Sequence, residues 1–196
     1  MGRKSAKDKK LLLVPSNVIS GLMEIANKQG KPFQGFVAET LQSALEVYAQ
    51  GYSLEEIANT FELLGVCKSL GSKIVSDDIF GYLIDKVYVT DGEILRKKMY
   101  EFGRLCGRNL VSKHQNPLAE LKRLLSILGW DLNEASATNK DENVEIRCIS
   151  PVLSVQDTEL LMNLVNGLVD AFGYEIEKQD CIKGIISLRC SKKRRS

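Results

Sequence analysis

Histidine is almost absent from this sequence, because His114 is the only one among 196 residues. With a single histidine, the sequence offers little support for a histidine-based zinc site or a Ser-His-Asp triad. His114 itself lies in a polar stretch, residues 112–117, which predicts a solvated loop. The five cysteines form no Cys-x-x-Cys pair, and their odd number predicts reduced, mostly buried thiols. We expect neither a metal site nor a cofactor.

Long apolar runs and phosphate-binding loops are also missing. No run of about 18 apolar residues occurs, so we expect no membrane span. The basic N-terminus leads into only four apolar residues before Pro15, too few for a signal peptide, which predicts a cytoplasmic protein. Neither Gly-rich phosphate loop is present. The acidic pairs 55–56 and 77–78 stand at predicted helix starts, where they favour the helix dipole, so no catalytic residue and no enzyme activity is expected.

Charge is distributed unevenly along the chain, although the formal net charge is only +2. Residues 1–10 hold five basic side chains against Asp8, and residues 192–195 are all basic. The segment between these ends is therefore acidic overall. Basic arms on an acidic body suit contact with a polyanion such as nucleic acid, although basic ends can also be merely solvated.

The first 51 residues contain one short apolar run and two helical patterns. Residues 9–14 precede Pro15 and predict a strand, and helical periodicity then runs from Ser16 to Gln29-Gly30 and from Phe33 to Gly51. A lone strand leaves its backbone groups unpaired, and about forty residues bury too little surface to fold unaided. The pattern therefore predicts that a second copy of the chain pairs with this strand.

The order of strand, proline, helix, glycine turn and helix resembles the ribbon-helix-helix family, the Arc/MetJ/CopG type of dimeric DNA-binding protein. The resemblance covers about the first quarter of the chain. It implies that alternate strand residues face the bases and that the second helix clamps a phosphate at its N-terminus. Together with the basic arm, the residues expected to contact double-stranded DNA are Arg3, Lys4, Lys7, Lys9, Lys10, Leu11, Leu13, Lys31, Pro32 and Phe33.

The remainder predicts a helical connector and a helix-rich α+β domain. Ser53 and Glu56 have the spacing of a capping box, and helical patterns follow at 76–87, from Thr90 onward and at 118–128. Gly103 and Gly107 lie four apart on one face of the long helix, so we expect another backbone to approach there. Cys106, between them, fits either a helix-packing thiol or a redox sensor close to two arginines.

A small antiparallel sheet is expected at the C-terminal end. Residues 144–150 alternate as a half-buried strand does, a helix follows from Ser154 to Phe172, and two strands at 174–179 and 184–190 close the domain. Trp130 to Leu132 are predicted to begin a further strand, and residues 133–142 to form a turn. The predicted organisation is 1–51, a connector at 52–89, an α+β domain at 90–191 and a basic tail at 192–196.

This second half resembles the vinyl-reductase-type ligand-binding domain, which is related to the TRAPP-subunit fold and to heme-nitric-oxide-binding domains. The resemblance rests on the stretches 100–107 and 128–130 and on the closing Cys181-Ile182-Lys183-Gly184. It implies a pocket for a small hydrophobic molecule.

Two functions follow from these observations. The first is a homodimeric DNA-binding transcriptional regulator whose C-terminal domain senses a small molecule or adds a dimer contact. The second is a scaffold or small-ligand-binding module without DNA binding, in which the strand-helix-helix unit serves only for dimerisation. Leu11 and Leu13 favour the second function. Bases are told apart by hydrogen bonds, which leucine cannot form, and an apolar ribbon face is better suited to contact with protein.

Overall fold

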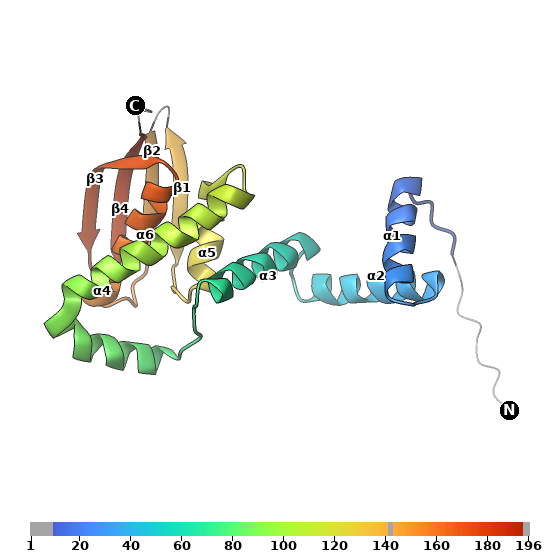
Figure 1. The fold of residues 1–196 in the computed structure, drawn as a ribbon, viewed down its shortest axis with the longest axis horizontal. Coiled ribbons are helices and arrows are strands. Elements are labelled where there is room, and N and C mark those ends of the chain that lie inside the picture. The colour runs from blue at the N-terminus through green and yellow to red at the C-terminus, as the bar shows by residue number, and fades with distance from the viewer. Residues whose placement is uncertain (1–9, 141–142, 194–196) are drawn as a thin grey trace. The chain divides into compact units, whose positions relative to one another are not determined.

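A computed structural model describes residues 10–140 and 143–193 of the chain (Figure 1). The chain divides into two compact units, one up to Ile57 and one from Ala58 onward. The domain boundaries predicted from the sequence remain a prediction. No helix in the described ranges combines the length and the apolarity that a membrane crossing requires.

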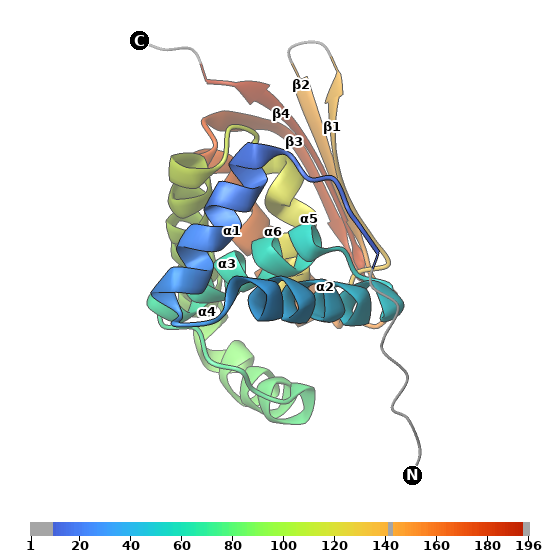
Figure 2. The same cartoon turned by 90° about the vertical axis from the view of Figure 1, so that its right-hand side faces the viewer.

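The N-terminal unit is a pair of helices, α1 (Ser16–Lys28) and α2 (Phe33–Ala49), which cross steeply (Figure 2). Both helices lie where the apolar periodicity predicts them, and Gly30 and Gly51 end them with φ of 66° and 85°. The predicted strand is absent from the described residues that precede α1: residues 10–15 belong to no strand and no helix. The ribbon of the predicted ribbon-helix-helix unit is therefore not seen.

This unit has almost no core of its own. Between residues 10 and 57, Ala26 alone is buried. Apolar side chains such as Leu11, Leu13, Leu41 and Leu45 are exposed by half or more of their surface. Two helices of this length cannot supply a stable core, so the unit needs another surface to cover it.

The second unit contains the remaining elements in an α+β arrangement. Its helices are most of α3 (Leu54–Ser69), α4 (Asp77–Lys113), the 3₁₀ turn η1 (Pro117–Glu120), α5 (Leu121–Ile127) and α6 (Val155–Ala171). Its strands are β1 (Glu134–Lys140), β2 (Asn143–Ile149), β3 (Tyr174–Ile182) and β4 (Ile185–Lys192). The α+β class with a small antiparallel sheet, predicted from the sequence, is confirmed.

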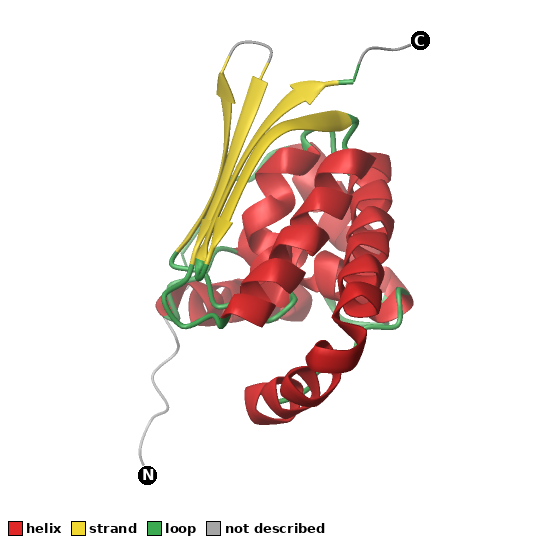
Figure 3. Cartoon of the chain, turned by 90° about the vertical axis from the view of Figure 1, so that its left-hand side faces the viewer, coloured by secondary structure: helices red, strands yellow, loops and turns green. Residues whose placement is uncertain are grey.

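The sheet is antiparallel with strand order β1-β2-β4-β3, and the helices gather on one of its faces (Figure 3). Helix α6 lies on the sheet and α4 lies on α6 (Figure 1). Alternation puts Val144, Ile146 and Cys148 of β2 on the helix side, where they are buried, while Arg147 is exposed. The apolar stripe of α6 is buried at Leu160, Leu161, Leu164, Val165, Leu168 and Val169.

Residues 130–140 differ from the expectation. Trp130 to Leu132 begin no strand, and β1 runs through the segment predicted to be a turn. The inward positions of β1 are Ala135 and Ala137, which pair with Cys148 and Ile146. Alanine gives a weak apolar signal, and β1 pairs with β2 alone, so its conformation depends on a long-range partner rather than on its own sequence.

Helix α4 is two helices joined at a kink. Asp91 has non-helical angles (φ −126°, ψ 24°), so the continuous element divides where the sequence predicts a second helix to open, at Thr90 to Glu93. The predicted capping box at Ser53 and Glu56 is also present, because each residue accepts a hydrogen bond from the other's backbone N–H.

Candidate functional site

Helices α4 and α6 approach each other closely through glycines. A Cβ on Gly103 would collide with the Leu164 carbonyl oxygen, and a Cβ on Gly107 would collide with Ala171. Gly167 of α6 lies in the same contact, and a Cβ there would collide with the Tyr100 carbonyl oxygen. The close approach predicted from the Gly103–Gly107 spacing is therefore confirmed, and it sets the side chains of α4 directly against those of α6.

A cavity of about 580 Å³ lies beside this helix contact, where α6 turns into β3. Tyr100 of α4 and Asn166 and Asp170 of α6 line its helical side. The strand side is formed by two short runs, residues 174–176 of β3 and residues 191–193 at the end of β4. Its volume falls in the range of small-molecule pockets, and it joins four elements that are far apart in sequence.

Asp170 is the electrostatic centre of the cavity. Its carboxylate accepts a hydrogen bond from the Lys193 ammonium, and the Arg104 Nε lies 2.8 Å from its Oδ2. The Lys193 ammonium, together with Tyr100 and Arg104, holds the pKa of this carboxyl below its usual range despite partial burial. Asp170 is therefore a charged anchor rather than a proton donor at neutral pH.

Tyr100 and Asn166 complete the helical wall. Burial and the Asp170 carboxylate raise the pKa of the Tyr100 phenol, which donates a hydrogen bond to Asp170. Arg104 stacks over the Tyr100 ring at 6.0 Å. The Asn166 Nδ2 donates to Gln179 at 3.3 Å, while the buried Asn166 Oδ1 has no hydrogen-bond partner.

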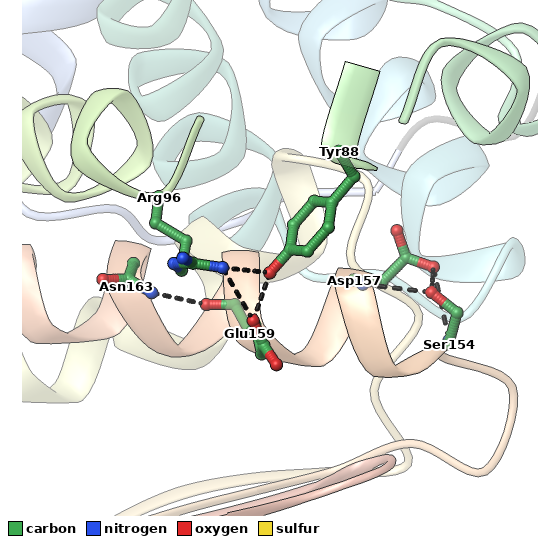
Figure 4. A network of polar contacts seen from close by, with 6 residues as sticks. All are labelled: Tyr88, Arg96, Ser154, Asp157, Glu159 and Asn163. Carbon is green, nitrogen blue, oxygen red and sulfur yellow. Dashed lines mark hydrogen bonds and ion pairs between the residues drawn. The ribbon is translucent and has the colours of Figure 1, made fainter. Parts of the chain in front are cut away.

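A second polar cluster clamps the kink of α4 onto α6 (Figure 4). Tyr88 lies before the kink and Arg96 after it, and both donate hydrogen bonds to the same Glu159 oxygen, Arg96 at 3.1 Å. Arg96 also donates to the Tyr88 hydroxyl at 2.9 Å. The Tyr88 ring lies 3.3 Å from where a Cβ on Gly92 would stand. This cluster fixes the direction of the first half of α4, and the cavity beside Asp170 does not include it.

Of the residues predicted to contact DNA, those that the structure describes lie in two places, before α1 and at the start of α2. Lys10, Leu11 and Leu13 are exposed in the unpaired segment before α1. Lys31 forms an ion pair with Glu39 at 2.6 Å, and Pro32 and Phe33 begin α2. Arg3, Lys4, Lys7 and Lys9 lie outside the described residues. Contact of these residues with DNA remains a prediction.

The two residues singled out for their chemistry are structural. Cys106 is completely buried, and burial raises the pKa of its thiol to about 12, so it is not a thiolate at neutral pH. This supports the packing role over the redox role. His114 caps the C-terminal end of α4 and is half-buried rather than solvated, which corrects the expectation.

Most of the cavity escapes inspection of the sequence. Asn166 and Asp170 are spaced i and i+4 on α6, and Lys192 and Lys193 belong to a run that was predicted as a basic tail. The only local signals of this site in the sequence are Gly167, inside an amphipathic helix, and the polar residues Asn166 and Asp170 beside it. Neither signal indicates that Tyr100, some seventy residues upstream of Asp170, completes the wall.

Comparison with known proteins gives few matches. No protein-family model matches the chain, and no curated protein matches it. Two solved structures are similar in part. One, solved to probe the function of heme distortion in the H-NOX family, has a TM-score of 0.39 and 15% identity over 73% of this chain and 90% of that chain. The other is an oxygen-binding H-NOX domain related to soluble guanylate cyclases, with a TM-score of 0.35 and 14% identity over 70% of this chain and 86% of that chain.

These findings correct both family resemblances. The similar structures are H-NOX domains, neither ribbon-helix-helix nor vinyl-reductase-type proteins, so both assignments are wrong. The DNA-binding transcriptional regulator is wrong with them. The structural reason lies in residues 10–15, which form no strand that could enter a groove.

Heme does not fit the cavity beside Asp170. Heme iron is held by histidine, cysteine, methionine or tyrosine. His114, the cysteines and the methionines do not line this cavity. Tyr100 does line it, but its hydroxyl is committed to Asp170 and its raised pKa disfavours the phenolate. Within the described ranges, no three histidine, cysteine or acidic side chains converge as metal ligands.

Proposed function

We propose that this chain is a small-molecule-binding module, with its ligand in the cavity between α4, α6, β3 and β4. The observation that carries the proposal is a built polar wall: Asp170 is held by Lys193, Arg104 and Tyr100, and Asn166 lines the cavity beside it. Rigid positioning by close-packed helices favours a preformed site. Because this lining is charged, we expect the ligand to be polar, whereas the sequence predicts a hydrophobic one. The proposed role is binding, without catalysis.

The test is chemical-shift mapping on the full-length protein. Phenol, benzoate, benzylamine and cyclohexanol are titrated one at a time into isotope-labelled protein. We expect at least one of them to shift the amides of Tyr100, Asp170 and Tyr174 together. Tyr174→Ala should abolish that response, whereas Tyr82→Ala, at a tyrosine 62% exposed on α4, should leave it intact. Scattered shifts with all four compounds would reject the cavity as a binding site.

A second role is favoured by the N-terminal unit. Its helices bury only Ala26 and leave Leu41, Leu45 and Tyr48 exposed. A second copy of the chain presents the same uncovered surface, and two-fold pairing of identical patches is the commonest way to cover one. Homodimerisation through α1 and α2 is therefore part of the proposal. The five free cysteines, four of them buried, support a reducing, cytoplasmic location.

A further inference from the structure

We propose that residues 10–14 of one copy of the chain add a strand to the outer edge of β1 in a second copy. This inference rests on the proposed homodimer and deepens it, because it names the element that each copy lends to the other. Three observations carry it: the unprotected edge of β1, the exposed apolar segment before α1, and the half-buried apolar side chains beside β1.

The outer edge of β1 lacks the features that normally protect the edge of a sheet. β1 pairs with β2 on one side, and within the described ranges no strand pairs with its other side. Its register with β2 is continuous from Glu134 to Lys140, without a bulge. Only its first and last residues are charged, and it contains no proline. A flat edge of this kind is a template for pairing with another chain.

The opposite edge of the same sheet, β3, is protected. Its register with β4 shifts between Ile176 and Lys178, which leaves Glu177 as a bulge. Charged and exposed side chains follow one another along the strand, at positions 175, 177, 178 and 180. Bulges and charges on an edge strand oppose the addition of a further strand. The two edges therefore differ, and β1 is the one suited to accept a strand.

Residues 10–14 have the properties of the strand that this edge would accept. Leu11, Leu12 and Leu13 are exposed by 92%, 70% and 89%, and the segment belongs to no strand and no helix in the single chain. Its length is enough for a short strand, and it contains neither glycine nor proline. Pro15 ends it, because proline lacks the N–H that a further pair requires. A sheet edge supplies both the backbone partners and the cover that such a segment needs.

The helix side of the sheet offers a place for the inward side chains of an added strand. Ala135 and Ala137 face that side of β1, and their small side chains leave room for larger ones on a neighbouring strand. Helix α5 contacts β1, and its end contributes Ile127 and Leu128, which pack against the core but are only partly buried. Alternate residues of the added strand would point to this side and cover them.

A second copy is the source of the strand, because the single chain leaves both partners open. In the single chain, residues 10–14 form no strand, and no described strand pairs with the outer edge of β1. The segment leads directly into α1, which belongs to the proposed dimer contact, so dimerisation would hold it at a high effective concentration beside the other copy. Two-fold symmetry then gives each copy one segment and one edge, and the two edges are covered reciprocally.

Disulfide crosslinking between two variants of the full-length chain tests the strand geometry. Residues 10–13 are replaced by cysteine one at a time, and each variant is mixed with Thr138→Cys in the presence of copper phenanthroline. Thr138 is an exposed residue of β1. We expect a crosslinked dimer, which neither variant gives alone, at every second position of the segment, because successive strand residues point to opposite faces. Ser187→Cys, at an exposed position of the central strand β4, should give no crosslink with any of them.

Amide hydrogen exchange tests the edge itself. Exchange in the wild-type chain is compared at a concentration where sedimentation shows a monomer and at one where it shows a dimer. We expect β1 to exchange at least about fivefold more slowly in the dimer and β3 to exchange equally in both. The double variant Leu12→Asp/Leu13→Asp should remove this protection, because one of two adjacent residues must face the helices and carry its charge there. Ile74→Asp/Val75→Asp, at two exposed residues between α3 and α4, should keep it.

The outcomes separate strand addition from the proposed dimer. A dimer without slower exchange in β1 would overturn strand addition and leave the dimer in place, and a monomer at every concentration would overturn both. Protection of β1 that does not depend on concentration, with crosslinks only inside one chain, would show that the segment covers its own β1 and would overturn the exchange between copies. Crosslinks at all four consecutive positions would reject a strand. Circular dichroism of each variant, checked first, shows that the fold is kept.

Discussion

Asp170 stabilises the fold through one carboxylate shared by three elements. Lys193 after β4, Arg104 of α4 and Tyr100 of α4 all contact it. Hydrogen bonding to Lys193, foremost, lowers the pKa of the Asp170 carboxyl in the folded state. Its unfolded pKa is about 3.9. A carboxyl whose pKa falls on folding stabilises the fold above the unfolded value and loses that contribution as the pH falls through the folded value.

We therefore expect Asp170→Asn to lower the free energy of unfolding by about 1 kcal/mol at neutral pH. The difference between wild type and variant should shrink as the pH falls below about 4. Urea unfolding at pH 7, 4 and 3 measures it. Asp180→Asn, at a side chain 62% exposed and paired only with Lys178, should change stability by less than about 0.5 kcal/mol at any pH. A deficit for Asp170→Asn that is the same at all three pH values would contradict the assignment.

Gly184 provides the second prediction at the level of single residues. It has φ of 74°, and a Cβ there would collide with the Ser150 carbonyl oxygen. Its backbone N–H also donates to Thr158 at 2.9 Å. Gly184→Ala should therefore cost about 2 kcal/mol or more, from left-handed strain and overpacking together.

Gly129→Ala is the matched control for Gly184→Ala. Gly129 has φ of 85° but open space around the position of a Cβ. Gly129→Ala should therefore lose only about 1 kcal/mol of stability, because left-handed strain is its single cost. Thermal or urea unfolding of the two variants decides the comparison, and equal losses would mean that the Ser150 contact contributes nothing.

At the scale of elements, α4 and α6 depend on Gly103 and Gly167. A methyl group at either position would have to push the two backbones apart. Gly103→Ala and Gly167→Ala should each lower the free energy of unfolding by about 1–3 kcal/mol. Gly65→Ala, in α3 with nothing near its Cβ position, should instead stabilise by up to about 1 kcal/mol. Urea unfolding measures all three, and stabilisation by Gly103→Ala would refute the close packing.

The clamp on the α4 kink predicts a local effect. Tyr88→Phe removes the hydroxyl that joins Glu159 and Arg96. We expect faster amide hydrogen exchange over residues 77–90, because the first half of α4 buries only Ile84 and depends on this contact. Tyr82→Phe, at an exposed position of the same segment, should leave exchange unchanged. Identical exchange in both variants would show that the clamp does not hold the segment.

At the scale of the whole molecule, the uncovered N-terminal unit predicts self-association. The full chain should sediment as a dimer at micromolar concentration, and Leu45→Glu should shift it toward the monomer because Leu45 is 65% exposed on α2. Gln34→Glu introduces the same charge into the same helix at its favourable N-terminal end and should leave the dimer intact. A wild-type monomer would mean that other parts of the same chain cover these side chains.

The sequence alone determined the local features of this protein. Apolar periodicity placed α1, α2 and α6, because burial of one stripe has the period of the helix itself. The glycines at 30, 51, 129 and 173 ended helices through their positive φ. Even one long-range contact was predictable, because two glycines on one helical face admit a backbone.

The tertiary structure decided the rest. Strand β1 exists because β2 pairs with it, and its alanines carry little apolar signal. The cavity exists because packing brings Tyr100, Asp170, Tyr174 and Lys192 together from four elements. No local period connects these residues, since their proximity depends on the close approach of α4 to α6 and on the register of β3 with β4. Backbone conformation is largely a local matter, whereas a binding site is built from side chains that only the folded chain brings together.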